Sequence, residues 1–439
     1  MTLEEKQEQM FARWLEPQGV EFAGEEAKRA YQERVNRFKD AIQLKKAPDR
    51  VPVHPMTGLF PLAYAGVTLY EAMYDYEKAG TALRKYVLEL EPDAHNGMFL
   101  WPPGRFFELL DYRLYKWPGH GVPADSCYQY VEAEYMKAEE YDALINDPTD
   151  FWLRTYLPRI FGNLKPFAKL ATLTDVLELP LTCGSFVPFG LPEVQEALRA
   201  VMEAGSEALR WVGVMQSVES GLAAQGFPGM FGGATKAPFD IIGDTLRGTH
   251  GILMDMYRRP DKLLEALERV TPLAIRMGVS MAKMSGNPVV FIPLHKGADG
   301  WLSDKQFKTF YWPTLKKVIL GLVEEGLVPF LFAEGGYNTR LEVIAPDLPP
   351  GSTIWLFDDT DMARAKEILG KVACIAGNVP ITLLTLGTPQ EVKEYCKRLI
   401  ETAGRDGGFI LSSGAVIDNI RPENVRALIE AAREYGRYA

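Results

Sequence analysis

Cysteine is scarce in this 439-residue chain, which contains only Cys127, Cys183, Cys374 and Cys396. No two of them form a Cys-x-x-C pair, and their spacing is not that of a zinc finger. Four cysteines are too few for a disulfide scaffold in a chain of this length. We therefore expect them to be packing residues, and we expect the protein to work in a reducing compartment, the cytoplasm.

The sequence also lacks a basic excess and a long apolar run. It has 48 Lys and Arg against 58 Asp and Glu, a net charge of −10. This balance argues against a general nucleic-acid or anionic-membrane binder, which needs cations to displace counterions. The most apolar stretch, residues 318–332, is interrupted by Glu324 and Glu325 and is too short to span a bilayer. The acidic, helical N-terminus is unlike a signal peptide.

Short apolar runs alternate with longer amphipathic segments along most of the chain, and 47% of the residues are hydrophobic. Continuous apolar strands that alternate with helices indicate a parallel sheet covered by helices. The predicted strands are Val51–His54, Met98–Trp101, Pro228–Gly232, Pro288–His295, Val328–Ala333, Thr353–Asp358, Val372–Gly377 and Gly408–Ser413. The predicted helices include Glu25–Leu44, Lys262–Met284, Lys305–Glu325, Asp361–Leu369, Pro389–Thr402 and Pro422–Tyr438.

Eight strands of this kind can form an open doubly wound sheet or a closed (β/α)8 TIM-type barrel. The glycine-rich phosphate turn and the P-loop that usually mark the open sheet are absent, which favours the barrel. We expect an N-terminal helical extension at 1–48 and a barrel at 49–439. A helical and loop insertion rich in aromatic residues is expected at about 95–225. This insertion can pack on itself, or it can form a lid over a flat aromatic ligand. The two interpretations are compatible.

Reactive side chains stand at the ends of the predicted strands, where the active site of a barrel forms. They are His54, His295, Glu334, Asp358, Asp359, Asn378, Ser412 and Ser413. Each has a structural alternative: His295 can be a hydrogen-bonded loop residue, Asp358 and Asp359 can cap the next helix, and Asn378 can hold a turn.

Several segments carry a resemblance to a known family. They are Gly251–Lys262 (GILMDMYRRPDK), Ile375–Pro380 (IAGNVP), Leu386–Val392 (LGTPQEV), Gly408–Gly414 (GFILSSG) and Arg421–Asn424 (RPEN). In these segments the chain resembles the uroporphyrinogen decarboxylase superfamily, and more specifically its branch of corrinoid-dependent methyltransferases. The resemblance implies a (β/α)8 barrel with its pocket at the carboxyl ends of the strands.

Two branches of that superfamily fit the residues poorly. The decarboxylases bind a polycarboxylate through an Arg-Gln-Ala-Gly-Arg segment after the first strand, and the matching segment here, His54–Phe60, contains no arginine. The thiol methyltransferases hold zinc with a His-x-Cys pair and a late cysteine. The matching positions here are Phe332, Glu334 and Ala415.

The remaining branch removes methyl groups from methoxylated compounds and passes them to the cob(I)alamin of a corrinoid protein. The resemblance implies zinc held by oxygen and nitrogen ligands, for which we predict His295, Glu334 and Asp358, with Asp299 as another candidate for the third. The predicted catalytic residues are Glu334, His295 and His54. Asn378, Tyr337 and Asp359 are the predicted substrate-binding residues.

The resulting hypothesis is a cytoplasmic methyltransferase that demethylates a small aromatic methoxy compound. Its partner is a corrinoid protein that carries the cobalamin, and a second copy of the chain is a further candidate partner. Two alternatives stay open: a decarboxylase of the uroporphyrinogen type, and a corrinoid- or tetrapyrrole-binding protein without catalysis.

Overall fold

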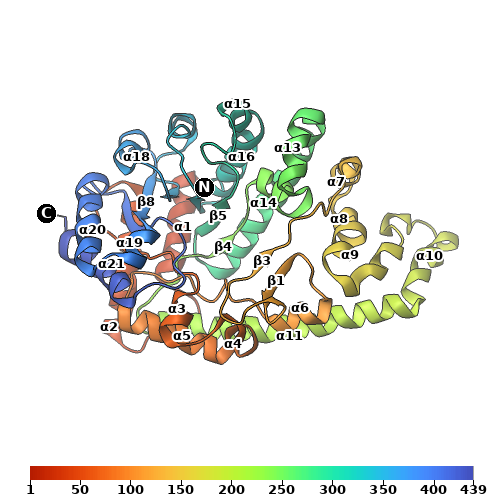
Figure 1. Cartoon of the computed structure of the whole chain (residues 1–439), viewed down its shortest axis with the longest axis horizontal. Coiled ribbons are helices and arrows are strands. Elements are labelled where there is room, and N and C mark those ends of the chain that lie inside the picture. Colours follow the sequence, from red (N-terminus) through yellow and green to blue (C-terminus); the bar gives the residue numbers. More distant parts are fainter. Residues whose placement is uncertain (439) are drawn as a thin grey trace.

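Six parallel strands follow one another around a barrel in sequence order (Figure 1). The computed structural model describes residues 1–438. The strands are β4 (Gly233–Ala234), β5 (Val289–Leu294), β6 (Val328–Ala333), β7 (Ile354–Phe357), β8 (Cys374–Val379) and β9 (Phe409–Ser413). All residues of β6, β7, β8 and β9 are buried, which explains why these strands appear in the sequence as continuous apolar runs.

Two short extended segments complete the ring. Segment 51–54 is bonded to β9, where the amide of His54 donates to the carbonyl of Leu411 at 2.9 Å. Segment 93–96 is bonded to segment 51–54 on one side at 3.1 Å, and on the other side to Met230, just before β4, at 2.9 Å. The chain therefore forms the (β/α)8 TIM-type barrel that the sequence predicts, closed by eight segments.

Helices connect the barrel segments on the outside, close to the predicted ranges. The first connection contains α3 (Phe60–Ala65), α4 (Leu69–Tyr74) and α5 (Tyr76–Leu90). The later ones contain α12 (Pro238–Asp240), α13 (Gly248–Arg258), α14 (Pro260–Ser285), α15 (Asp304–Gln306), α16 (Trp312–Val323), α17 (Leu341–Ile344), α18 (Met362–Leu369), α19 (Ile381–Leu386), α20 (Pro389–Ala403) and α21 (Pro422–Tyr435).

Two N-terminal helices close the bottom of the barrel, where the strands begin. They are α1 (Leu3–Leu15) and α2 (Glu25–Gln43). Lys6 donates to the carbonyl of Glu324 at 2.7 Å, in the loop before β6. The buried side chains of both helices form one cluster with the first inward-facing residues of the strands: Phe11, Trp14, Tyr31, Val35 and Phe38 pack with Val289, Val328, Ile354 and Cys374.

Residues 97–227, between the second and third barrel segments, form a large excursion. It contains α6 (Gly104–Leu110), α7 (Tyr141–Asn146), α8 (Pro148–Phe151), α9 (Leu157–Ile160), α10 (Leu179–Phe186) and α11 (Pro192–Ala224). It also contains a small sheet of β1 (Tyr115–Pro118), β2 (Gly121–Val122) and β3 (Gln129–Tyr130), which the sequence did not predict. In Figure 1, α10 and the start of α11 extend beyond the barrel on the right. No helix within residues 1–438 is both long and apolar enough to cross a membrane.

One predicted strand was wrong, and a second, Pro228–Gly232, lies directly before the observed strand β4 (Gly233–Ala234). Met98–Trp101 forms a turn, and the second barrel segment is 93–96 instead. This segment escapes the usual strand pattern because it begins with the buried carboxylate of Asp93. Two arginines compensate that charge, Arg37 at 2.8 Å and Arg50 at 2.7 Å. Buried charges are tolerated when they are paired in this way.

Candidate active site at the mouth of the barrel

The ends of β5 and β6 bring His295 and Glu334 together. His295 directly follows β5 and Glu334 directly follows β6, and Nε2 of His295 lies 3.6 Å from Oε1 of Glu334. Both side chains are partly open to solvent, with exposed fractions of 36% and 41%. On the other side of the imidazole ring, Nδ1 of His295 lies 2.6 Å from Oδ2 of Asp244. Because an ionised carboxylate only accepts hydrogen bonds, Nδ1 carries a proton, and Nε2 is turned toward Glu334.

Asp244 is held as an anion by its surroundings. Burial acts to raise the pKa of its carboxyl group, but the hydrogen bond to His295 and the charges of Lys236 and Lys296 outweigh burial and lower it. Lys236 pairs with Oδ2 of Asp244, and Nζ of Lys296 lies 2.8 Å from Oδ1. Burial acts to lower the pKa of His295. The hydrogen bond to Asp244 and the negative charges of Asp244 and Glu334 outweigh burial and raise this pKa overall. The imidazole is therefore fixed in position and favoured in its protonated form.

A second carboxylate supports the same loop from below. Oδ2 of the fully buried Asp240 accepts a hydrogen bond from the amide of His295 at 3.0 Å and one from the hydroxyl of Tyr311 at 2.8 Å. Burial and the neighbouring charge of Asp244 raise the pKa of Asp240 to about 6. Asp240 thus fixes the backbone that carries His295.

The sequence analysis did not identify Lys236, Asp240 or Asp244. All three follow β4, and the two aspartates are four residues apart in the helical segment formed by α12 and a π-helix at Ile241–Leu246. Residues at this spacing lie on one helix face. Their position after the third predicted strand is the only local signal, because they lie several residues beyond the strand end, inside a helical segment.

Asp358, Asp359 and Asn378 lie in the loops after β7 and at the end of β8. Oδ2 of Asp358 accepts from the amide of Gly335 at 3.1 Å, and the amide group of Asn378 donates to the carbonyl of Asp358 at 3.0 Å. Asp359 is exposed. The helix-capping role weighed for Asp358 and Asp359 belongs to Asp361, whose side chain caps α18. Asp358 and Asn378 therefore fix the loop geometry beside Glu334.

Tyr337 and His54 are buried in the protein. Tyr337 is fully buried, so its side chain packs in the core and does not face the open cavity. His54 is also fully buried, and burial lowers its pKa to about 4. Nε2 of His54 lies 2.7 Å from Oδ1 of Asn96, whose amide nitrogen donates to the carbonyl of Thr57 at 2.8 Å. His54 is thus neutral, and its ring packs edge-to-face against Phe231 and Phe330.

An aromatic floor and a tyrosine-rich cover enclose the cavity. Phe231, Phe291 and Phe332 lie inside the barrel below His295 and Glu334, with ring centres 4.9 Å apart for the first two. Above them, the hydroxyl of Tyr130 in β3 donates to the backbone carbonyl of Asp244. The ring of Tyr115 lies 5.5 Å from that of Tyr130 and 5.8 Å from that of Tyr128. The small sheet of the excursion therefore contacts the segment after β4 at the mouth of the barrel. A lid over a flat aromatic ligand stays a prediction.

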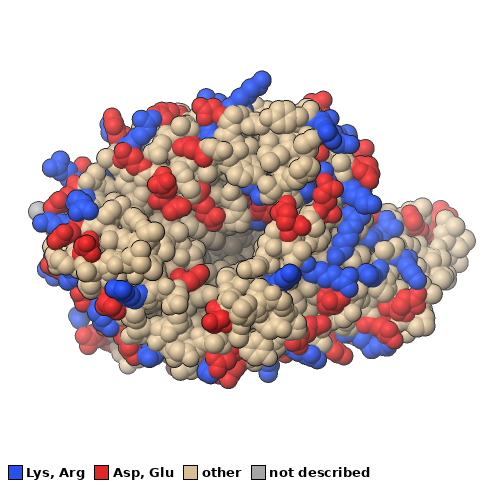
Figure 2. Space-filling view, in the orientation of Figure 1, with Lys and Arg blue, Asp and Glu red and all other residues tan. Residues whose placement is uncertain are grey.

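Figure 2 shows this face of the molecule hollowed at its centre, inside the ring of barrel strands seen in Figure 1. Acidic side chains border the hollow. The two lysines that approach it, Lys236 and Lys296, are both paired with Asp244. The cavity is thus apolar at its base and carries mainly carboxylates at its rim.

The predicted zinc ligands form a pair rather than a triad. His295 and Glu334 face each other, but the carboxylate of Asp358 is held by the amide of Gly335. Asp299 binds the amide and the hydroxyl of Thr339. Among residues 1–438, no three His, Cys, Asp or Glu side chains form a group that could hold a metal ion. The side chains as placed do not fit a three-ligand zinc site, and zinc stays a prediction of the sequence.

The C-terminal half of the chain is similar to known proteins. Residues 222–435 match the family model described as uroporphyrinogen decarboxylase (URO-D). The uroporphyrinogen decarboxylase of Aromatoleum aromaticum is 24% identical over 254 residues, which are 56% of this chain and 66% of that protein. The one from Geobacter sulfurreducens is 26% identical over 204 residues, 46% of this chain and 58% of that protein. The chain thus spans less than two thirds of the length of these relatives.

A solved structure shares the fold over nearly the whole chain. The methyltransferase from Methanosarcina mazei has a TM-score of 0.60 with this chain, at 18% sequence identity, and the match covers 92% of this chain and 98% of that one. At this identity the likeness concerns the fold alone. Only 8% of this chain lies outside the match, and the excursion at residues 97–227 is much longer than that, so the likeness includes most of the excursion as well as the barrel.

Proposed function

We propose that the protein is a methyltransferase, and the match of residues 222–435 to the family model for uroporphyrinogen decarboxylase supports an enzyme of that superfamily. It would move a methyl group from a methoxylated aromatic molecule to the cob(I)alamin of a partner corrinoid protein. The observation that carries the proposal is the Asp244–His295–Glu334 arrangement, which holds the imidazole of His295 by its Nδ1 above an aromatic floor and turns its Nε2 toward Glu334.

Demethylation of an aryl ether requires a better leaving group than a bare phenolate. When the methyl group is transferred, the bond between methyl carbon and ether oxygen breaks, and its electron pair stays on the oxygen. Nε2 of His295 is placed to give its proton to that oxygen, while Nδ1 remains bonded to Asp244. Glu334, 3.6 Å from Nε2, is placed to return a proton to the imidazole or to orient it. General acid catalysis of this kind typically contributes about 10²–10⁴-fold.

The cavity also suits a flat, uncharged ring. Phe231, Phe291 and Phe332 provide an apolar surface from below, and Tyr115 and Tyr128 lie in the cover. Aromatic side chains of this kind pack on an aromatic ligand in offset or edge-to-face geometry. Holding the ring in this way would align the methyl carbon with an incoming acceptor at the open side of the barrel.

The decarboxylase alternative is favoured by the names of the curated relatives, but the charges of the site argue against it. A polycarboxylate substrate needs cations that are free to pair with it. Lys236 and Lys296, the basic side chains at the mouth named above, are both paired with Asp244. Two basic side chains that could bind carboxylates there are therefore already engaged.

The direct test is methyl transfer with chemically defined partners. The purified protein is incubated with 2-methoxyphenol and chemically reduced cob(I)alamin, and methylcobalamin is followed by its absorbance. We expect methyl transfer, and we expect the His295→Gln variant to lose it by at least about 100-fold. Carbon dioxide release from uroporphyrinogen without any methyl transfer would support the decarboxylase instead.

A metal analysis accompanies this assay, because zinc bound through His295 and Glu334 would provide a Lewis acid in place of the imidazolium. Loss of activity with a chelator and its recovery with zinc would assign the role to the metal. Full activity of metal-free protein would assign it to His295.

A further inference from the structure

Four polar side chains lie side by side at the mouth of the barrel: His295, Glu334, Asp358 and Asn378. They stand at the ends of four consecutive strands, β5 to β8. The register in which β5 pairs with β6, β6 with β7 and β7 with β8 brings the four residues to one level of the sheet when it is continued past the last bonded pairs. We call this set the mouth row.

The mouth row faces the inside of the barrel. The residues two positions before its last three members are Phe332, Leu356 and Ala376, and all three belong to the cluster inside the barrel. Side chains alternate between the two faces of a strand, so residues that are two positions apart point to the same side. The polar side chains of the row therefore turn toward the cavity, above the aromatic floor.

The two ends of the mouth row differ in charge. At the β5 end, Asp244 is paired with two lysines and His295 faces Glu334. At the β7 end, Oδ2 of Asp358 accepts a hydrogen bond from the amide of Gly335 at 3.1 Å, and Oδ1 has no hydrogen-bond partner. Within residues 1–438, no Lys, Arg or His side chain forms an ion pair with Asp358. The negative charge at this end is therefore not compensated by the protein.

Asn378 adds a second free acceptor at the same end. The residue is 8% exposed, and its Nδ2 donates to the carbonyls of Asp358 at 3.0 Å and Thr360 at 2.9 Å. Two carbonyls require the nitrogen on their side, so Oδ1 is the atom that is left, and it is buried without a partner among residues 1–438. A buried acceptor is unfavourable without a donor, which a ligand can supply.

The carboxylates of Glu334 and Asp358 are neighbours in the row. Adjacent strands lie about 4.8 Å apart, and like charges directly opposite each other on two strands are destabilising. A positive charge beside Asp358 would relieve this repulsion and would also face the free acceptor of Asn378. Beyond His295, the mouth row thus presents only hydrogen-bond acceptors and negative charge.

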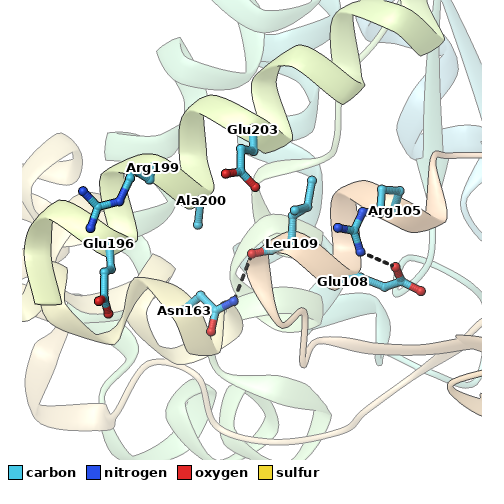
Figure 3. A pocket seen from close by; sticks show the side chains of 8 residues that line it. All are labelled: Arg105, Glu108, Leu109, Asn163, Glu196, Arg199, Ala200 and Glu203. Atoms are coloured by element: carbon cyan, nitrogen blue, oxygen red, sulfur yellow. Dashed lines mark hydrogen bonds and ion pairs between the residues drawn. The ribbon is translucent and has the colours of Figure 1, made fainter.

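A groove elsewhere on the protein shows the contrast. The groove of about 420 Å³ between α6 and α11 is lined by side chains of both signs: Arg105, Arg199, Glu108, Glu196 and Glu203 (Figure 3). Arg105 lies 3.1 Å from Glu108 in this groove, so the two charges compensate each other. A groove with both signs does not select the charge of a ligand, whereas the β7 end of the mouth row does.

We propose that the β7 end of the mouth row binds an ammonium group of the substrate, so that the methyl donor is a methoxyphenyl-alkylamine. This inference rests on the proposed function and adds a charge to its substrate. An ammonium group has three N–H donors and no acceptor, which matches the free oxygens of Asp358 and Asn378. A metal ion fits less well, because no three His, Cys, Asp or Glu side chains among residues 1–438 form a group that could hold one.

The spacing of the strands places the ammonium group on the substrate. His295 follows β5 and Asp358 follows β7, so their backbones are two strand spacings apart, roughly 10 Å. With the ether oxygen at Nε2 of His295, an ammonium group at Asp358 lies on the opposite side of the ring. The ammonium group therefore belongs on a short alkyl chain para to the methoxy group, and the ring over the aromatic floor stays uncharged.

Binding of three related ethers tests the charge without any methyl transfer. Isothermal titration calorimetry in the presence of a chelator compares 4-methoxyphenethylamine, 4-methoxyphenethyl alcohol and 3-(4-methoxyphenyl)propanoate. We expect the amine to bind about 10–100-fold more tightly than the alcohol, which is the strength of hydrogen bonds to a charged group. The propanoate should bind most weakly, because its carboxylate is repelled by Asp358.

Asp358→Asn tests the residue that carries the inference. The amide keeps an acceptor for the backbone of Gly335 but removes the negative charge. The affinity for the amine should fall at least about 10-fold, while the affinity for the alcohol should not change. The matched control is Glu367→Gln, at an exposed carboxylate of α18 on the outside of the barrel, which should change neither affinity. An amine preference that Asp358→Asn does not reduce would overturn the inference.

Methyl transfer from the same three ethers to cob(I)alamin separates the ammonium site from the proposed function. Tighter binding of the amine without methyl transfer from any of the three ethers would support the ammonium site and contradict the proposed function. Methyl transfer from the amine and the alcohol at equal rates, with equal affinities, would overturn the ammonium site and leave the proposed function intact.

Discussion

The two ends of the barrel are built from the same strands but have opposite character. At the end where the strands begin, α1 and α2 seal the interior with aromatic side chains such as Phe11, Trp14 and Phe38. At the end where the strands finish, His295 and Glu334 are partly exposed and ionisable. Apolar packing closes the end where the strands begin. At the end where they finish, hydrogen bonds and ion pairs fix His295 and Glu334 in a partly exposed position.

The closed end of the barrel therefore contributes to the stability of the fold, and the open end carries the reactive groups. Burying aromatic surface stabilises the fold and leaves the lower end without a reactive group. The upper end keeps its charges because each is compensated, as Asp244 is by His295 and the two lysines. Substitutions at the lower end should therefore change the free energy of unfolding, and substitutions at the upper end should change activity.

The largest expected effect is on the closed end. Trp14 is 3% exposed and stacks between Phe11 at 6.3 Å and Phe38 at 6.2 Å. Trp14→Ala should lower the free energy of unfolding by about 3–5 kcal/mol, because it leaves a cavity in the aromatic cluster that α1 and α2 form at the closed end. Urea unfolding followed by circular dichroism measures the change, with the exposed Leu3→Ala as control. A decrease of less than about 1 kcal/mol in the free energy of unfolding would show that this aromatic cluster does not stabilise the barrel.

The second prediction concerns the open end. Glu334→Gln should reduce the rate of methyl transfer by at least about 100-fold, because the amide cannot exchange a proton with His295. The free energy of unfolding should change by no more than about 0.5 kcal/mol, since the side chain is 41% exposed. The same urea titration and the methylcobalamin assay provide both values. A large loss of stability would mean that the two ends are not separable in this way.

The closed parts of the fold were the easier ones to predict. The strands β6 to β9 and the helices α2, α14, α18 and α20 lie close to their predicted ranges, because apolar runs and helix caps mark them. Segment 93–96 was missed since Asp93 is buried through partners that lie far away in sequence, Arg37 and Arg50. No local pattern reveals such compensation.

The site was predictable only where it lies at strand ends. His295 and Glu334 directly follow β5 and β6, and the structure brings them together. Asp244 lies within a helical segment, and its role depends on a contact with a residue 51 positions away. Tyr337 follows Glu334 closely in sequence, but its side chain turns into the core. The direction of a loop side chain is set by tertiary packing and leaves no trace in the local sequence.

The third prediction concerns the pH dependence of stability that the buried histidines His54 and His95 cause. Burial lowers the pKa of each histidine to about 4 in the folded protein, from about 6.5 when unfolded. Their contribution to stability is therefore complete above pH 6.5 and is lost as the pH falls toward 4. Each should remove about 3 kcal/mol over this range. Urea unfolding at several pH values should show that His54→Gln flattens this decline.

The control for that measurement is Leu88→Gln, at an exposed position without a titrating side chain, which should leave the pH dependence unchanged. An unaltered decline in the His54→Gln variant would mean that His54 is accessible to protons in the folded state. His54 would then belong with the reactive open end, as the sequence analysis predicted for a catalytic residue.

The smallest expected effect concerns the cover of the open end. Tyr130→Phe removes the hydrogen bond from β3 to the carbonyl of Asp244. Loss of one such bond costs about 0.5–1.5 kcal/mol, so the KM for 2-methoxyphenol should rise by a few-fold while kcat changes little. Tyr135→Phe is the matched control, because its hydroxyl bonds to Val131 within the excursion at 2.8 Å. Equal effects of the two substitutions would show that the small sheet acts through its own stability rather than by closing over the substrate.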